Sequence, residues 1–206
     1  MTVMAKYELN YEALDEEEQQ QKKADSVEEM LDWLEMLITV FFVIVLVFTF
    51  LFRIAIVDGE SMLPTLEDKD KLIVSHLFYE PEVGDVVIVN SKGLDKVIVK
   101  RVIATENQTI NIDYSEGKVY VDGQLLDEPY INELTYSDFG YHNYPVTVPA
   151  DCVFVMGDNR NRSTDSRAES VGFVNKADIM GKAIVRIWPF NKMGALTEDA
   201  GAAQNG

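Results

Sequence analysis

Hydrophobic residues follow two contrasting patterns along the chain. Residues 36–52, MLITVFFVIVLVFTFLF, form 17 consecutive positions without a charged side chain, bounded by Glu35 and Arg53. From residue 58 onward, short runs of alternating apolar and polar residues are separated by turn-forming residues. A long uncharged run is typical of a helix that crosses a membrane, whereas short alternating runs are typical of β-strands. The pattern therefore predicts one N-terminal membrane helix followed by a β-rich domain.

The apolar run has the length that a bilayer requires. At about 1.5 Å per residue, 17 helical residues extend about 26 Å and 20 residues about 30 Å, which matches the hydrocarbon core. A cleavable signal peptide would begin near residue 1 with basic residues, and a buried core helix would have a polar face. Neither fits, so we predict a transmembrane helix over residues 33–57, with Trp33 as its interfacial anchor. Basic residues occur on both sides of the helix, so charge does not predict the orientation.

Several segments after this helix show the alternation expected of strands. A hairpin is predicted over residues 118–126, with Asp122-Gly123 as its turn. We therefore expect a mainly β fold, with an antiparallel sheet within residues 58–192. Other strands are predicted over residues 85–89, 96–104, 109–112, 146–148, 152–156 and 182–187. The polar ends are predicted to be a mobile acidic tail over residues 1–32 and a disordered tail over residues 193–206.

Charge and cysteine content argue against several functions. The net charge of −17 disfavours nucleic acid as a partner, because proteins that bind nucleic acid are usually basic. The single cysteine, Cys152, excludes an internal disulfide. No Cys/His cluster has the spacing of metal ligands, and no glycine-rich phosphate loop is present. We therefore predict neither a metal ion nor a cofactor.

Ser61 lies in the turn-forming sequence DGESMLPTL, directly after the apolar run. Gly59 can adopt backbone angles that other residues avoid and would let a substrate backbone come close. Pro64 restricts the end of the turn, and main-chain N–H groups could point toward an oxyanion. The motif alone fits a reactive serine and an ordinary surface loop about equally.

Lys100 lies inside the apolar sequence VIVKRVIA. Strand alternation places it on the same face as Ile98 and Val102, so its ammonium group would be poorly solvated. Burial lowers the pKa of a lysine, and a neutral amine can accept a proton from a serine near pH 7. The histidines, His76 and His142, lie in no comparable motif. The alternative is a lysine at a sheet edge with its amine in solvent.

A third polar segment, GDNRNRSTDSR over residues 157–167, follows an apolar strand. The hydroxyl of Ser163 or Ser166 could hold a lysine nitrogen without protonating it. The charged residues offer two opposite-charge pairs that could stiffen the loop: Asp158, Arg160, Asp165 and Arg167. A solvated charged loop is the alternative.

Together these segments resemble the type I signal peptidases, membrane-bound Ser/Lys endopeptidases that remove signal peptides from secreted preproteins. The resemblance covers residues 36–190 and no part of the acidic head. It rests on four boxes in the family's order: Ser61-Met62-x-Pro64-Thr65, Gly84-Asp85-Val86, Lys100-Arg101-Val102-Ile103-Ala104, and Gly157-Asp158-Asn159-Arg160 with Ser163-x-Asp165-Ser166-Arg167.

The resemblance implies a role for each residue at the site. Ser61 would be the nucleophile, Lys100 the general base, and Ser163 the hydroxyl that orients the lysine. Gly59 stands where some members carry a serine, which implies that backbone N–H groups, including that of Ser61, form more of the oxyanion hole. Two structural ion pairs are implied: Asp158 with Arg101, and Asp165 with Arg167.

The resemblance also implies a location and a substrate class. It indicates a bacterial, single-anchor, Gram-positive-like enzyme of the cell membrane, with an antiparallel β-sheet catalytic domain of the signal peptidase type outside the cytoplasm. Its partners would be secretory preproteins, cut after small residues at −1 and −3, and membrane lipid; we expect a monomer. Two alternatives remain, namely a Ser/Lys peptidase specialised for a pilin or conjugation factor, and a non-enzymatic membrane-tethered β module. A self-cleaving repressor-like protein is disfavoured, because the anchor replaces any DNA-binding helices.

Overall fold

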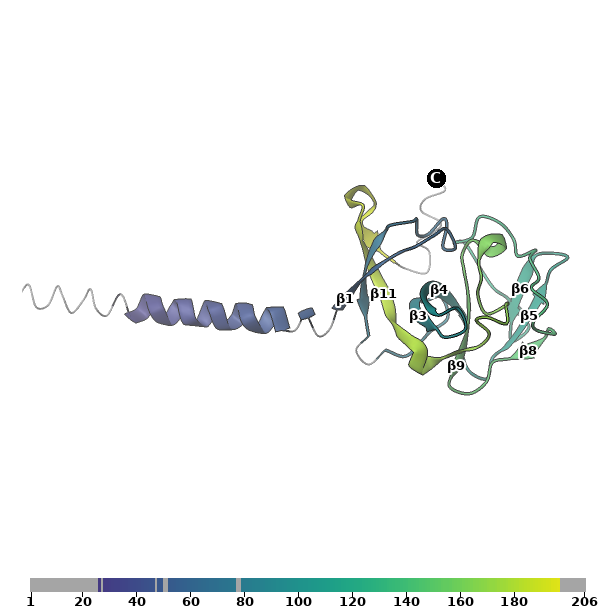
Figure 1. Cartoon of the computed structure of the whole chain (residues 1–206), viewed down its shortest axis with the longest axis horizontal. Helices are drawn as coiled ribbons and strands as arrows, with labels where there is room; N and C mark the ends of the chain where they lie inside the picture. The colour runs from purple at the N-terminus through teal and green to yellow at the C-terminus, as the bar shows by residue number, and fades with distance from the viewer. Residues whose placement is uncertain (1–25, 27, 47, 50–51, 77–78, 197–206) are drawn as a thin grey trace, which may run out of the picture. The chain divides into compact units, whose positions relative to one another are not determined.

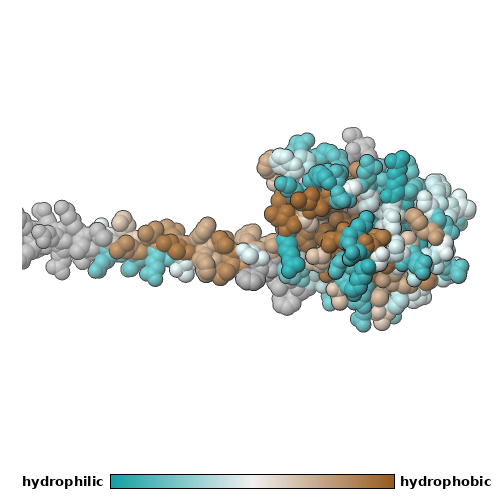
Figure 2. Space-filling view, viewed as in Figure 1, coloured by the Kyte–Doolittle hydropathy of each residue, from teal (hydrophilic) through white to brown (hydrophobic). Residues whose placement is uncertain are grey.

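The computed structural model describes residues 26, 28–46, 48–49, 52–76 and 79–196 of the chain (Figure 1). It divides into two units, residues 1–50 and 51–206. In the first unit, residues 28–46 and 48–49 are helical, and their apolar side chains are exposed (Figure 2). Among the residues that the structure describes, no helix is both long enough and apolar enough to cross a membrane. The predicted mobile tail lies outside the described residues, except for residues 26 and 28–32, which are helical.

The predicted helix over residues 33–57 is wrong at its C-terminal end. Residues Phe52–Ile56 form strand β1, which pairs antiparallel with β2, Lys71–Ser75. The β-branched residues Ile54 and Ile56 suit a strand as well as a membrane helix. Pairing with β2 gives this backbone its hydrogen-bond partners and decides in favour of the strand.

The second unit is built around two antiparallel sheets, which confirms the predicted fold class. Figure 1 shows the smaller sheet at the opposite side of this unit from β1 and β11. The main sheet has the order β1-β2-β11-β3-β4-β9-β10, and β12 pairs with β11. Its other strands are β3 (Val86–Ser91), β4 (Lys96–Ala104), β9 (Cys152–Met156), β10 (Val174–Asn175), β11 (Ile179–Trp188) and β12 (Gly194–Ala195). The smaller sheet has the order β7-β6-β5-β8, with β5 (Thr109–Asp113), β6 (Lys118–Val121), β7 (Gln124–Leu125) and β8 (Val146–Thr147).

The predicted hairpin is present, with its turn at the predicted residues. Strands β6 and β7 pair across Asp122 and Gly123, whose φ angles are 52° and 78°. Two positive φ angles are what a type I′ turn requires, and Asp-Gly is a preferred sequence for it. Short 3₁₀ helices complete the unit: η1 (Arg160–Arg162), η2 (Lys176–Asp178) and η3 (Phe190–Lys192).

The prediction of a disordered tail over residues 193–206 is wrong at its start. Residues Gly194–Ala195 form β12 against β11, and the N–H of Leu196 donates to the carbonyl of Ile184 over 3.0 Å. The small, polar composition of this segment predicted a frayed end, but backbone pairing requires no particular side chain. Residues 197–206 lie outside the described residues.

Candidate active site

Ser61 lies on a tight turn that follows β1, and apolar side chains of this turn are buried in the core. Met62 and Leu66 are buried in a core that the main sheet covers, and the N–H of Leu66 donates to the carbonyl of Met62 over 2.9 Å. Gly59 has a φ of +91°, which disfavours any residue with a side chain, and its N–H donates to Asp68 Oδ1 over 2.8 Å. A Cβ at Gly59 would meet no atom within 4 Å. The turn therefore leaves open space beside Ser61.

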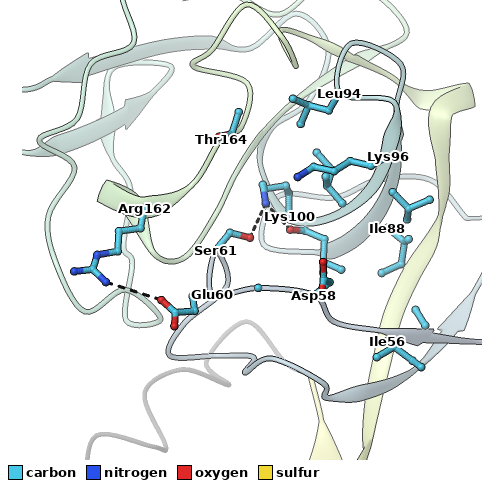
Figure 3. Close-up of a pocket in the computed structure, with 15 residues that line it drawn as sticks. Ile56, Asp58, Glu60, Ser61, Ile88, Leu94, Lys96, Lys100, Arg162 and Thr164 are labelled. Atoms are coloured by element: carbon cyan, nitrogen blue, oxygen red, sulfur yellow. Dashed lines mark hydrogen bonds and ion pairs between the residues drawn. The ribbon is translucent and has the colours of Figure 1, made fainter.

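Lys100 comes from the middle of β4 and meets Ser61 directly. Its Nζ lies 2.7 Å from Ser61 Oγ and donates a second hydrogen bond to the carbonyl of Val99 over 2.9 Å (Figure 3). Only 3% of the residue is exposed, because β4 is a central strand of the main sheet. The pKa of this amine falls from 10.5 to about 8, chiefly because burial disfavours the charged form; Asp165 opposes this shift, and the charge of Lys96 adds to it. A buried amine with this pKa can take the proton of the hydroxyl beside it.

The loop after β9 packs its backbone against the turn that carries Ser61. The N–H of Asn159 donates to the carbonyl of Ser61 over 3.0 Å, and Asn159 Nδ2 donates to the carbonyl of Glu60 over 3.0 Å. Gly157 makes the closest approach, since a Cβ there would lie 2.4 Å from the Ser61 carbonyl oxygen and 2.2 Å from Ser163 Oγ. Only glycine fits between these two serines. Gly157 belongs to one of the sequence motifs but is not among the site residues predicted from the sequence.

Ser163 is placed beside this glycine, with its hydroxyl buried. Its oxygen lies close enough to the Asp165 carboxylate to lower the pKa of that acid. Among the described atoms, however, no partner meets normal hydrogen-bonding geometry for this hydroxyl, and no hydrogen bond joins it to Lys100. The structure thus brings Ser163 to the site without bonding it to the amine.

Arg101 and Asp158 are fully buried and joined by two hydrogen bonds. Arg101 Nε donates to Asp158 Oδ1 over 2.8 Å, and Nη2 donates to Oδ2 over 2.7 Å. Thr65 donates to the same carboxylate over 2.5 Å, and Arg101 also holds the carbonyl of Gly84 over 2.8 Å. This pair links the Ser61 turn, β4 and the loop after β9.

Asp165 and Arg167 form a second fully buried pair within the loop. Arg167 donates to both carboxylate oxygens over 2.8 Å, and Asp165 Oδ2 also accepts from the N–H of Gly157 over 3.0 Å. Burial by itself would raise the pKa of Asp165, but Arg167 and the Gly157 N–H keep it below its ordinary value. Both ion pairs are internally neutral, so they can stiffen the site without adding net charge.

Arg160 has its partner outside the loop. Its guanidinium pairs with Glu128 and donates to Thr135 Oγ1 over 3.0 Å, and the ring of Tyr130 lies 5.9 Å away. Glu128 stands in no sequence motif and is not among the site residues predicted from the sequence. No sequence signal marks it, because the pairing depends on a segment that approaches only in the folded chain.

A cleft opens beside Ser61 and Lys100, between β1, β4 and the loop after β9 (Figure 3). Residues 96–100 of β4 pair only with β3, so among the described strands none pairs with the other edge of this segment. The apolar side chains of the lining are Ala55, Ile56, Ile88, Leu94, Val97 and Ile98. The described residues contain no group of three or more His, Cys, Asp or Glu side chains arranged to hold a metal ion.

Comparison with known proteins identifies the family. The family model described as "Signal peptidase, peptidase S26" matches residues 30–188. The chain belongs to this family. The probable signal peptidase I-2 of Synechocystis sp. is 36% identical over 180 residues, which cover 82% of this chain and 79% of that protein. The signal peptidase I S of Bacillus subtilis strain 168 is 34% identical over 179 residues, which cover 80% of this chain and 92% of that protein.

Signal peptidase relatives are also found among solved structures. A crystal structure of a signal peptidase I from Enterococcus faecalis V583 aligns with a TM-score of 0.41 and 28% identity, covering 50% of this chain and 97% of that one. The family match includes Ser61, Lys100 and the loop over residues 157–167. The resemblance to type I signal peptidases that the sequence motifs indicated is thereby confirmed.

Proposed function

We propose that this protein is a serine endopeptidase that removes signal peptides from secreted preproteins. The observation that carries the proposal is the 2.7 Å contact between Lys100 Nζ and Ser61 Oγ, in which the amine is buried and has a pKa of about 8. Family membership and relatives named signal peptidase I, aligned over most of their length, support the same activity.

The reaction proceeds through an acyl-enzyme. Ser61 Oγ attacks the carbonyl carbon of the scissile peptide bond, while Lys100 Nζ takes the hydroxyl proton. Collapse of the tetrahedral intermediate breaks the C–N bond, and the Lys100 ammonium returns the proton to the leaving amine of the mature protein. Lys100, neutral again, then deprotonates a water molecule that attacks the ester on Ser61. The bond between the acyl carbon and Ser61 Oγ breaks, Lys100 returns the proton to Oγ, and the signal peptide leaves with a free carboxylate.

The lowered pKa makes lysine a usable base at neutral pH. An ordinary lysine, with a pKa near 10.4, is neutral in only about 0.04% of molecules at pH 7. A pKa of about 8 raises this fraction to roughly 10%, a gain of more than a hundredfold. The buried carboxylates Asp165 and Asp158 oppose this lowering of the pKa, but each is paired with an arginine, and the charge of Arg167 itself favours the neutral amine.

Backbone N–H groups stabilise the oxyanion in this proposal. The N–H of Ser61 itself is the main donor, because Gly59 carries no side chain and its own N–H is occupied by Asp68. Asn159 holds the Ser61 carbonyl and so orients this part of the turn. Preorganised donors of this kind typically contribute a large share of catalysis in acyl transfer.

The preprotein lies extended in the cleft and adds its backbone to the free edge of β4. The apolar lining of the cleft suits small apolar side chains at −1 and −3. Ser163, which has a buried and unbonded hydroxyl, steadies the Lys100 amine once the substrate closes the site.

The membrane holds enzyme and substrate together. The uncharged run over residues 36–52 serves as a single-pass anchor, although residues 47, 50 and 51 lie outside the described part. On the β-rich unit, Ile56 and Trp188 lie opposite Lys71 in the sheet register. Both side chains are exposed, as is that of Phe190 beside Trp188, and exposed apolar side chains of this kind suit contact with lipid. The enzyme acts as a monomer with its catalytic domain on the extracytoplasmic side. Confinement to one bilayer raises the effective concentration of the substrate.

Cleavage of a preprotein by the full-length protein in detergent tests the proposal. The wild type is expected to cut at the signal-peptide boundary, and Ser61→Ala is expected to be inactive at an unchanged melting temperature. Cleavage by Ser61→Ala would remove the assignment of the nucleophile. Absence of cleavage by the wild type would favour a non-enzymatic β module.

A further inference from the structure

Three buried arginines surround the Ser61–Lys100 contact, and each is paired with one carboxylate. Two of these carboxylates, Asp158 and Asp165, belong to the loop after β9. The third, Glu128, belongs to the segment after β7 and pairs with Arg160. Glu128 is thus the member of this charge cluster that no catalytic motif contains.

The Arg160 side chain connects Glu128 to the backbone of the loop. Its Nε donates to the carbonyl of Gly157 over 3.2 Å, while Nη2 pairs with Glu128 and Nη1 donates to Thr135. On the other side of the same residue, the N–H of Gly157 donates to Asp165. Both ends of Gly157 are therefore held by buried charged groups.

Gly157 is the residue that touches both serines of the site. A Cβ there would lie 2.2 Å from Ser163 Oγ and 2.4 Å from the carbonyl oxygen of Ser61. With so little space, a shift of the Gly157 peptide must displace Ser61 or Ser163. Ser61 Oγ in turn is the hydrogen-bond partner of Lys100. A path of direct contacts therefore runs from Glu128 to the reacting atoms.

The pairing with Arg160 is the interaction that explains a charged residue at the buried position of Glu128. Its side chain is only 8% exposed, and burial raises its pKa, while Arg160 opposes that rise. Burying a carboxylate is unfavourable unless it is paired, and removing one partner leaves the other charge buried and uncompensated. Without Glu128, the Arg160 guanidinium would keep hydrogen bonds only to Thr135 and the Gly157 carbonyl within the described residues.

We propose that Glu128 is a positioning residue of the active site, which acts through Arg160 to fix the Gly157 peptide against Ser61 and Ser163. The inference rests on the proposed function of Ser61 and Lys100. Glu128 is not among the residues that line the cleft, so it touches neither the substrate nor the reacting atoms. Its loss must therefore change the rate of the chemical step more than the affinity for substrate.

The test is steady-state kinetics on the full-length protein in detergent, with Glu128→Gln as the main variant. The glutamine keeps the shape and removes the charge. We expect kcat to fall about 10- to 100-fold, since a misplacement of about 1 Å has that effect, and KM to stay within about twofold. KM should change little because Glu128 is not among the residues of the cleft in which the substrate would bind.

Glu133→Gln is the matched control. It makes the same chemical change in the same segment, but Glu133 is exposed, and its partner Asn161 keeps a second bond to the carbonyl of Leu134. We expect wild-type kcat and KM for this variant. Ser61→Ala is the second control and is expected to be inactive.

A double-variant cycle distinguishes positioning from general stabilisation. If Glu128 acts through Arg160, the kcat of Glu128→Gln/Arg160→Gln equals that of Arg160→Gln alone, because the path is already broken. If Glu128→Gln does not fold, Glu128→Asp takes its place, since its shorter side chain must still displace Arg160.

Three results would overturn the inference: wild-type kcat in the Glu128 variant, a loss carried by KM, or multiplicative losses in the double variant. If cleavage by the wild type still depends on Ser61, any of these three results leaves the proposed function intact. Cleavage by Ser61→Ala would overturn both.

Discussion

Lys100 lies between Ile98 and Val102 on its face of β4, where it is 3% exposed. Strand alternation predicted that these residues share one face, because its period is two, but the central position of β4 in the main sheet is what buries the amine. Its consequence is the pKa of about 8, which changes lysine from a permanent cation into a base that works near neutral pH.

Cleavage should depend on pH through this one amine. Because the neutral form is the base, kcat/KM is expected to rise about tenfold per pH unit below pH 7 and to level off above about pH 8. The measurement is kcat/KM between pH 5.5 and 9.5, on a substrate without ionisable groups near the cleavage site. A flat profile over this range would contradict a lysine base.

Replacement of Lys100 by methionine should stabilise the fold at neutral pH. Burial lowers the pKa in the folded state, so below pH 8 the folded protein carries a buried charge at a cost that the unfolded chain does not have. A shift from 10.5 to about 8 corresponds to about 3 kcal/mol at pH 7. The difference should shrink as pH rises through 8 and vanish above about 10.5.

Chemical denaturation of wild type and Lys100→Met at pH 7 and pH 10.5 measures this effect. Equal stability of the two proteins at pH 7 would show that the amine is well solvated.

At the scale of elements, the loop after β9 is a rigid support rather than a mobile segment. Gly157 lets it approach the Ser61 turn, and the pairs Arg101–Asp158 and Arg167–Asp165 hold it in place. Both pairs are fully buried, where the loss of one partner is costly.

Gly157→Ala should disrupt the site. The added methyl group would overlap Ser163 Oγ and the Ser61 carbonyl, so we expect kcat to fall by about 100-fold or more, with a lower melting temperature. Gly194→Ala is the matched control, since a Cβ there meets no atom within 4 Å, and it should retain wild-type activity. Wild-type kcat in Gly157→Ala would mean that the loop sits further from Ser61.

Asp158→Asn should destabilise the β-rich unit by about 3–5 kcal/mol, because Arg101 would remain buried without a counter-charge. Urea denaturation provides the measurement. Glu116→Gln, which breaks an exposed pair with Lys118, should leave the denaturation midpoint unchanged. Similar midpoints for all three proteins would contradict a structural role for the buried pair.

At the scale of the whole molecule, the two units serve different purposes. The β-rich unit carries the chemistry, and the proposed anchor over residues 36–52 brings it to the bilayer. The charges on the two sides of the apolar run do not predict its orientation; in the proposed function, the anchor would bring the enzyme close to a substrate that is itself held in the membrane.

Membrane attachment should be lost when a charge enters the apolar run. Ile44→Arg places a guanidinium at its centre, where an arginine costs about 2.5–3.5 kcal/mol in insertion experiments. We expect the wild type to remain in carbonate-washed membranes and a substantial fraction of Ile44→Arg to be released. Glu29→Arg, outside the run, is the control and should remain bound. Release of the wild type itself would contradict the anchor.

Much of this protein could be predicted from the order of its residues. Alternating Val and Ile marked the strands, Asp122-Gly123 marked the hairpin, and three motifs singled out Ser61, Lys100 and the loop at residues 157–167. These signals are local, because a strand period, a turn and a motif each depend on neighbours in the sequence.

Only the tertiary structure decided the features that join distant segments. Pairing with β2 made Phe52–Ile56 a strand, and pairing with β11 ordered the start of the C-terminal tail. The segment after β7 approaches the loop after β9, which brings Glu128 to Arg160. The cleft forms where β1, β4 and the loop after β9 come together. Backbone pairing and buried charge pairing accept many partners, so the choice among them depends on which segments the fold brings together.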